Sequence, residues 1–193
     1  VVESHDIELQ VRHLERMRGV SYPDVVKRVK SIIDSLKDPI LVVDATGVGR
    51  AVVDLFIAAG IQPYAVSIHG GDRVTNEGRE YRVPKRDLVA AVLVAMQKRQ
   101  LQIAASLPDA EVLIRELENF RVTIDPKTAH DSYSAWREGI HDDLVLAVAL
   151  AVWGATKFRR GKAIPIEYAR GRRNNIPSLG RVPTLDEVLK LLN

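Results

Sequence analysis

Hydrophobic and polar positions follow two different periods along the chain, and these periods predict strands and helices in turn. Ile7 to Leu14 changes polarity at every second residue, as a half-exposed strand does. Ser21-Tyr22-Pro23-Asp24 is typical of a helix start, and the apolar residues from Val25 to Leu36 recur at helical spacing. Ile40 to Val43 is short and continuously apolar, which indicates a parallel strand buried on both faces.

The same alternation continues to about residue 157. Strands and helices that alternate in this way indicate an α/β fold with a mainly parallel sheet. The remaining expected helices are Arg50–Ala59, Pro84–Arg99, Pro108–Asn119 and Asp142–Lys157, the remaining strands are Gln62–Ile68, Leu101–Ile103 and Phe120–Ile124, and the polar loops are Gly70–Tyr81 and Asp125–Ser134.

The length of the chain and the positions of its glycines and prolines predict one domain and an extension. The chain has 193 residues, of which 46% are hydrophobic and 27% charged, as in globular proteins that bury a core. Glycine and proline interrupt the region after residue 157, and Thr184 with Glu187 forms a capping box before a short helix over Leu185–Leu192. We therefore expect a domain over residues 1–157 and a basic extension over residues 158–193.

Charge is unevenly distributed between these two parts. Residues 157–193 contain nine Lys/Arg and three Asp/Glu, a net charge of +6, whereas the other 156 residues carry 19 basic and 22 acidic groups. A basic extension is compatible with phosphate contacts, and equally with a solvated tail. The absence of cysteine excludes disulfides and thiolate metal sites, and no apolar run is long enough to span a bilayer. A cytoplasmic location fits both observations.

The first candidate for chemistry is Asp44, which ends the apolar strand Ile40–Val43. Ligands of α/β proteins bind beyond the carboxyl ends of parallel strands, and the turn Thr46-Gly47-Val48-Gly49 brings backbone N–H groups together at a helix start, which suits an anion. Asp44 could instead simply cap this turn. A nucleotide-binding P-loop fits poorly, because no Gly-Lys-Ser/Thr follows.

The second candidate is His141-Asp142-Asp143, at the start of an apolar helix. Successive helical residues point about 100° apart, so only one of the two aspartates can face a given site fully. We expect Asp142 to be the direct metal ligand, with Asp143 beside it. His141 could orient a ligand or contact phosphate, or it could act as an ordinary helix cap. Carboxylates that converge on divalent cations are a common means of cleaving phosphodiesters.

Arg82, Lys85 and Arg86 form a third candidate group, at the entry of an amphipathic helix. Such residues can grip a nucleic-acid backbone through charge-assisted hydrogen bonds, although an exposed helix start with solvated cations has the same sequence.

With these segments together, the chain resembles the C-terminal nuclease domain of the large terminase subunit of tailed bacteriophages, which has the RNase H-like fold. The similar segments span roughly residues 1–155, and they are Val11–Arg16, Ser21–Val26, Asp44–Gly49, Val83–Leu88 and His141–Leu144.

The resemblance implies a metal-dependent endonuclease that cuts concatemeric DNA during genome packaging. It implies a central, mainly parallel mixed sheet flanked by helices, and a two-metal Mg²⁺ or Mn²⁺ site held by Asp44, Asp142 and Asp143, with His141 and Thr46 supporting these ligands. It implies double-stranded DNA as the partner, contacted by Lys85, Arg86 and Arg82. It also implies further partners in the cytoplasm of the bacterial host, namely a packaging ATPase domain, the portal and the small terminase. No membrane is expected to be involved.

One departure from the family bears on activity. The resemblance aligns Val1-Val2-Glu3 with the end of the family's second strand, so the first strand, with its metal-bridging aspartate, is expected to be missing. The enzyme therefore lacks one expected ligand and could be inactive as this fragment. Two alternatives stay open: a non-catalytic DNA-binding or assembly module of prophage origin, and a nuclease similar to Holliday-junction resolvases.

Overall fold

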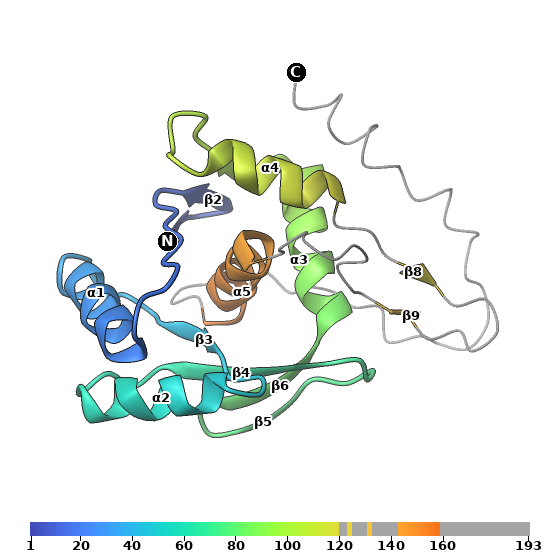
Figure 1. Cartoon of the computed structure of the whole chain (residues 1–193). Helices are drawn as coiled ribbons and strands as arrows, with labels where there is room; N and C mark the ends of the chain where they lie inside the picture. Colours follow the sequence, from blue (N-terminus) through green and yellow to red (C-terminus); the bar gives the residue numbers. More distant parts are fainter. Residues whose placement is uncertain (120–122, 125–130, 133–142, 159–193) are drawn as a thin grey trace.

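The computed structural model describes residues 1–119, 123–124, 131–132 and 143–158, and these form helices and short sheets packed in layers (Figure 1). The expected extension over residues 158–193, with its terminal helix, lies outside the described residues except for Phe158. The helices are α1 (Tyr22–Asp34), α2 (Gly49–Ala58), α3 (Lys85–Gln97), α4 (Ala110–Asn119) and α5 (Asp143–Lys157). The strands are β1 (Val2–His5), β2 (Glu8–Val11), β3 (Val42–Asp44), β4 (Tyr64–His69), β5 (Thr75–Glu77), β6 (Glu80–Pro84), β7 (Leu101–Ile103), β8 (Thr123–Ile124) and β9 (Asp131–Ser132).

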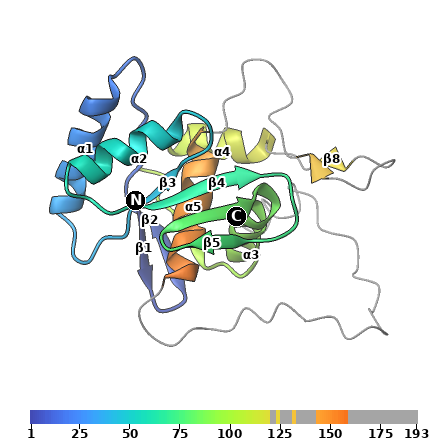
Figure 2. The ribbon, with the colours of Figure 1, turned by 90° about the horizontal axis from the view of Figure 1, so that it is seen from below.

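The largest sheet has four strands in the order β3-β4-β6-β5. The β3–β4 and β4–β6 pairs are parallel, and β5 is antiparallel to β6 at the edge (Figure 2). Helix α2 covers one face of this sheet, where Val53 packs with Ala45 and Ala65. Helices α3 and α5 lie on the other face (Figure 1). The expected α/β class is thus confirmed.

A second sheet, of three strands, has the order β1-β2-β7. Strand β1 is antiparallel to β2, and β2 is parallel to β7. Among the described residues, no strand of this sheet is hydrogen-bonded to a strand of the four-stranded sheet, so the single central sheet expected from the sequence is divided in two. Strands β8 and β9 form a separate antiparallel pair.

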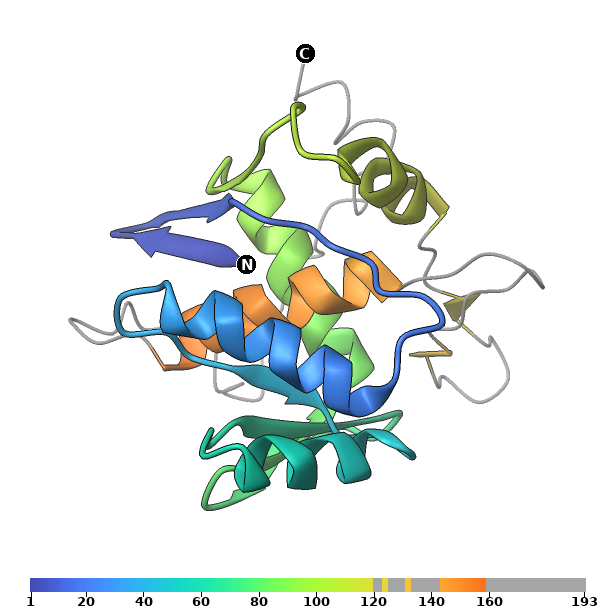
Figure 3. The same cartoon turned by 60° about the vertical axis from the view of Figure 1, so that its left-hand side comes forward.

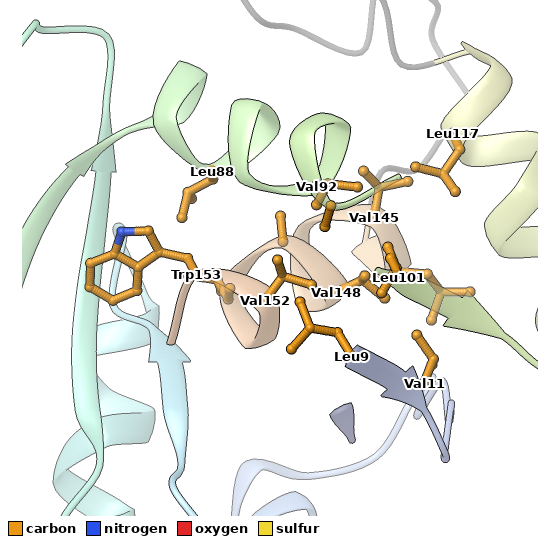
Figure 4. Close-up of a cluster of buried hydrophobic side chains, with 14 of the residues drawn as sticks. Leu9, Val11, Leu88, Val92, Leu101, Leu117, Val145, Val148, Val152 and Trp153 are labelled. Atoms are coloured by element: carbon orange, nitrogen blue, oxygen red, sulfur yellow. The ribbon is translucent and has the colours of Figure 1, made fainter. Parts of the chain in front are cut away.

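Helix α5 lies at the centre of the hydrophobic core and contacts both larger sheets. Figure 4 shows its residues Val145, Val148 and Val152 between side chains of α3 and side chains of the three-stranded sheet, such as Leu9 and Leu101. At the other end of the helix, Trp153 meets the ring of Tyr81 on β6, with ring centroids 5.3 Å apart. Burial of this apolar surface on both sides is the main force that holds the two sheets together.

Local sequence rules account for several elements, and both predicted loops differ from the prediction. Ser21 caps α1 as expected, because its side-chain oxygen accepts a hydrogen bond from the Asp24 N–H at 3.4 Å. The segment Gly70–Tyr81 is not a single loop, since it contains β5 and the start of β6, and the predicted loop Asp125–Ser134 contains β9. Among the described residues, no helix combines the length and the apolar character needed to cross a membrane.

Candidate functional site

Asp44 faces the side of the four-stranded sheet that α5 covers. Side chains alternate between the two faces of a strand, so Asp44 shares a face with Val42 two residues earlier. It is also in register with Val66 on β4 and, through Val66, with Tyr81 on β6, and both of these residues belong to the core around α5. Asp44 is the last residue of β3 and is half-buried, so its carboxylate stands at the carboxyl end of the parallel strands, next to solvent.

Thr46 fixes the orientation of the Asp44 carboxylate. The Thr46 N–H donates to Asp44 Oδ1 at 2.8 Å, and the Thr46 hydroxyl oxygen accepts a hydrogen bond from the Ile68 N–H at 2.8 Å. The turn is thus tied to β4, and one carboxylate oxygen is committed to the turn. Asp44 is therefore compatible with both roles considered from the sequence. It caps the turn with Oδ1, and it retains Oδ2 to bind a ligand.

The start of α5 lies toward the same end of the sheet as Asp44. Gly154, in the last part of α5, packs directly on Val42 at the beginning of β3. Figure 3 shows that β3 and α5 run in opposite directions, so the first residues of α5 approach the end of β3. Asp143 is the first residue of the helix and its side chain is 66% exposed. His141 and Asp142 lie outside the described residues.

A buried carboxylate from another helix caps α5. Glu116 Oε2, on α4, accepts hydrogen bonds from the N–H groups of Leu144 and Val145 at 2.9 and 3.1 Å. The Glu116 side chain is only 6% exposed, and burial raises its pKa, although the two backbone N–H groups and Arg16 act against this rise.

Arg16 joins Glu116 to Asp143. Its guanidinium group is 3.3 Å from Glu116 Oε1 and donates a hydrogen bond to Asp143 Oδ2 at 3.0 Å. The Glu116 Oε1 contact is an ion pair without hydrogen-bond geometry, and within the described part of the chain this atom has no hydrogen-bond partner. Arg16, Glu116 and Asp143 form a charged group, here called the α5 triad, with two negative charges and one positive charge when both carboxyl groups are ionised.

The sequence gives no direct signal for Glu116, which lies in an ordinary amphipathic helix, and includes Arg16 only as part of a segment similar to terminases. Their roles follow from contacts 28 and 127 residues apart along the chain. Helical periodicity alone cannot distinguish a buried acidic residue from an exposed one when its neighbours in the helix are both apolar and polar.

The three basic candidates do not lie on one surface. Arg82 is exposed on β6, between Tyr81 and Val83, whose side chains enter the core around α5. It therefore points to the opposite face of the sheet from Asp44. Lys85 is half-buried as the first residue of α3.

Arg86 binds the loop before β5. Its guanidinium forms an ion pair with Asp72 Oδ1 at 2.8 Å and donates to the Asp72 carbonyl oxygen at 3.0 Å. A weaker pair with Asp87 is 3.6 Å long, and burial raises the Asp87 pKa while Arg86 opposes that rise. Arg86 therefore ties this loop to the start of α3.

Among the residues that the structure describes, no three His, Asp or Glu side chains come together as a metal site. Oxygen donors of the kind that Mg²⁺ and Mn²⁺ prefer are nevertheless present at the carboxyl end of β3 and at the start of α5. Asp44 and Asp143 are carboxylates of this kind, but they do not by themselves make up a metal site within the described residues.

Comparisons with known proteins identify relatives of the chain. No model of a known protein family matches it. Over 138 residues, 72% of the chain, it is 28% identical to the large terminase subunits of Thermus phage G20c and of Thermus virus P23-45. The chain spans only 25% of the length of these relatives.

The fold is similar to a solved structure of the same kind. This is the crystal structure of the large terminase nuclease from thermophilic phage G20c with bound cobalt, at a TM-score of 0.55 and 27% identity, covering 72% of this chain and 65% of that one. The chain is thus homologous to terminase large subunits and has the RNase H-like fold of their nuclease domain. Both relatives are phage proteins, and the similar structure is that of a terminase nuclease.

Proposed function

We propose that this chain is a metal-dependent DNA endonuclease of terminase type, which cuts concatemeric DNA during phage genome packaging. The observation that carries the proposal is the placement of Asp44. Asp44 ends β3, a parallel strand at the edge of the four-stranded sheet, and its carboxylate faces α5. Thr46 holds one carboxylate oxygen, and the start of α5 lies toward the same end of the sheet.

Divalent metal would be held by Asp44, Asp142 and Asp143, with Mg²⁺ or Mn²⁺ as the proposed ion. The bound cobalt of the G20c nuclease supports a divalent site in the family. When bound, a metal pair would supply activation of water and stabilisation of the leaving oxygen. Thr46 would keep the Asp44 carboxylate in one orientation, and His141 is proposed to support the ligands at the start of α5.

Double-stranded DNA is the proposed substrate, and Lys85 and Arg86 are the proposed contacts nearest to the carboxyl end of the sheet. Both start α3, directly after β6, which is parallel to β4. Arg82 would contact a different part of the duplex, because it leaves the opposite face. The further partners proposed are the packaging ATPase domain, the portal and the small terminase, in the cytoplasm of the bacterial host.

Plasmid nicking in the presence of Mg²⁺ or Mn²⁺ tests this function. We expect cleavage that EDTA abolishes, and a loss of at least about 100-fold for Asp44→Asn and for Asp142→Asn, because each removes a charged ligand. Asp54→Asn is the matched control, since Asp54 is an exposed aspartate on α2. Cleavage that both ligand variants retain would refute the site, and a wild-type protein that never cleaves would refute the activity.

A second candidate is a non-catalytic DNA-binding module, which the excess of basic residues after residue 157 favours. This module would bind DNA with a strong dependence on salt, without any effect of EDTA and without cleavage. Deletion of residues 159–193, which carry eight Lys/Arg, would then weaken binding steeply.

A further inference from the structure

The first turn of α5 is capped from outside its own helix. The N–H groups of the first turn have no partner within a helix, and a Ser, Thr, Asp or Asn just before the helix usually accepts hydrogen bonds from them. In this chain, Glu116 of α4 accepts the hydrogen bonds of Leu144 and Val145 instead. The acidic residues at the start of α5 are therefore not needed as caps for these two groups.

This arrangement places a carboxylate in the core, which is unfavourable unless the charge is balanced. Glu116 is 6% exposed, and Arg16 is the cation beside it, itself only 15% exposed. An unpaired buried charge destabilises a protein far more than an exposed one does, so Glu116 depends on Arg16. The same guanidinium also holds Asp143 Oδ2, so the position of Asp143 is coupled to the buried pair.

We infer that Glu116 and Arg16 are positioning residues for the acidic start of α5, because Glu116 fixes the first turn and Arg16 orients the Asp143 carboxylate toward a divalent cation. This inference rests on the proposed function, which supplies the cation. Arg16 takes only Oδ2, and no other partner of the Asp143 carboxylate is recorded within the described residues, so Oδ1 can be directed to a ligand. Neither residue is proposed to touch the cation.

Amide hydrogen exchange of the metal-free protein tests the cap. In Glu116→Ala we expect the amides of Leu144 and Val145 to exchange at least about tenfold faster, since they lose their acceptor. Glu116→Gln should restore most of the protection, because its amide oxygen can still accept. Protection of these two amides that is unchanged in Glu116→Ala would overturn the capping role.

Co²⁺ binding, followed by calorimetry and by visible absorption of the bound ion, tests the positioning. Residues that orient metal ligands typically change metal affinity about 10- to 100-fold when they are replaced. We expect Arg16→Gln to weaken Co²⁺ binding about tenfold. Arg16→Lys should weaken it less, because lysine keeps the positive charge, although it lacks the planar guanidinium group that contacts both carboxylates. Lys30→Gln, which removes a cation paired with Asp34 on α1, should have no effect.

A double-mutant cycle with Asp143→Asn separates positioning from a general structural effect. If Arg16 acts through Asp143, Arg16→Gln has no further effect on Co²⁺ affinity once Asp143 is replaced. An equal loss in both backgrounds, no loss, or tighter binding in Arg16→Gln would overturn the inference. Failure of the wild-type protein to bind Co²⁺ would instead refute the proposed metal site, and the exchange experiment would still decide whether Glu116 caps α5.

Discussion

The carbonyl oxygen of Asp44 occupies the space beside Gly49 in which any other residue would carry its Cβ atom. A Cβ at position 49 would lie 2.1 Å from that oxygen and 2.9 Å from the carbonyl carbon, both of which are backbone atoms that cannot rotate away. Gly47 has a different reason to be glycine, namely its φ of +58°. The two glycines of this turn thus bring the start of α2 against the residue proposed to bind metal.

Gly49→Ala should therefore destabilise the protein and displace Asp44. We expect a loss of about 1–3 kcal/mol in the free energy of unfolding, measured by urea denaturation, because an overpacked site must move its backbone. Gly70→Ala is the control, since a Cβ there meets nothing within 4 Å. Its effect should stay within about 0.5 kcal/mol, and equal effects of the two substitutions would contradict the close approach.

Leu88→Ala should strongly reduce stability, because Leu88 is fully buried on α3 against the core around α5. Replacement of a buried leucine by alanine costs about 2–5 kcal/mol, depending on how far the cavity collapses. Val94→Ala lies on the same helix at a position that is 45% exposed, and it should cost less than about 1 kcal/mol. Thermal and urea unfolding of the two variants would reveal this contrast, and similar losses would refute the assigned face of α3.

The pKa of Glu80 should depend on Arg50. The Arg50 guanidinium donates two hydrogen bonds to the Glu80 carboxylate, at 2.7 and 2.8 Å, and this pair lowers the Glu80 pKa below its ordinary value of 4.5. Because the pKa is lowered in the folded state, the pair stabilises the fold above about pH 4.5, and this contribution is lost as the pH falls through the lowered pKa. Carboxyl NMR titration of Arg50→Gln should show Glu80 returning toward 4.5.

Glu15 provides the internal control for that titration. It is paired with Arg28, which also lowers its pKa, so its titration should not change in Arg50→Gln. A Glu80 pKa that is the same with and without Arg50 would show that the pair does not persist in solution.

Arg86→Gln should loosen the loop before β5 without unfolding the domain. The guanidinium holds the carboxylate and the carbonyl oxygen of Asp72, so its loss should increase deuterium uptake over residues 70–74. The pair is partly exposed, and its effect on global stability should be less than about 1 kcal/mol. Arg82→Gln, at an exposed position of β6, should leave uptake in this loop unchanged, and a matching increase there would argue against a specific tether.

The parts of the fold that follow local rules were predictable. The capping of α1 by Ser21, the strand that ends at Asp44 and the period of α3 depend on neighbours within a few residues. Strand β5 was missed because Thr75-Asn76-Glu77 is exposed throughout and has no apolar alternation, so only its pairing with β6 makes it a strand.

The residues of the candidate site also fall into two groups, those that a motif identifies and those that only the packed structure identifies. Motifs identify Asp44, Asp143 and Thr46. The structure adds that Thr46 donates one hydrogen bond to Asp44 and accepts another from Ile68 on β4. Glu116 and Arg16 could not be found in this way, because their meaning arises only when α4, α5 and the segment after β2 pack together. The division of the strands between two sheets likewise depends on long-range pairing that no local pattern specifies.

The central position of α5 has a consequence for the order of events during synthesis. Both larger sheets are made from residues that leave the ribosome earlier, yet each relies on this last described helix to cover its apolar face. Until residues 143–158 emerge, the parts of these faces that α5 covers would remain open to water. The two larger sheets should therefore complete their packing together, once α5 has been made.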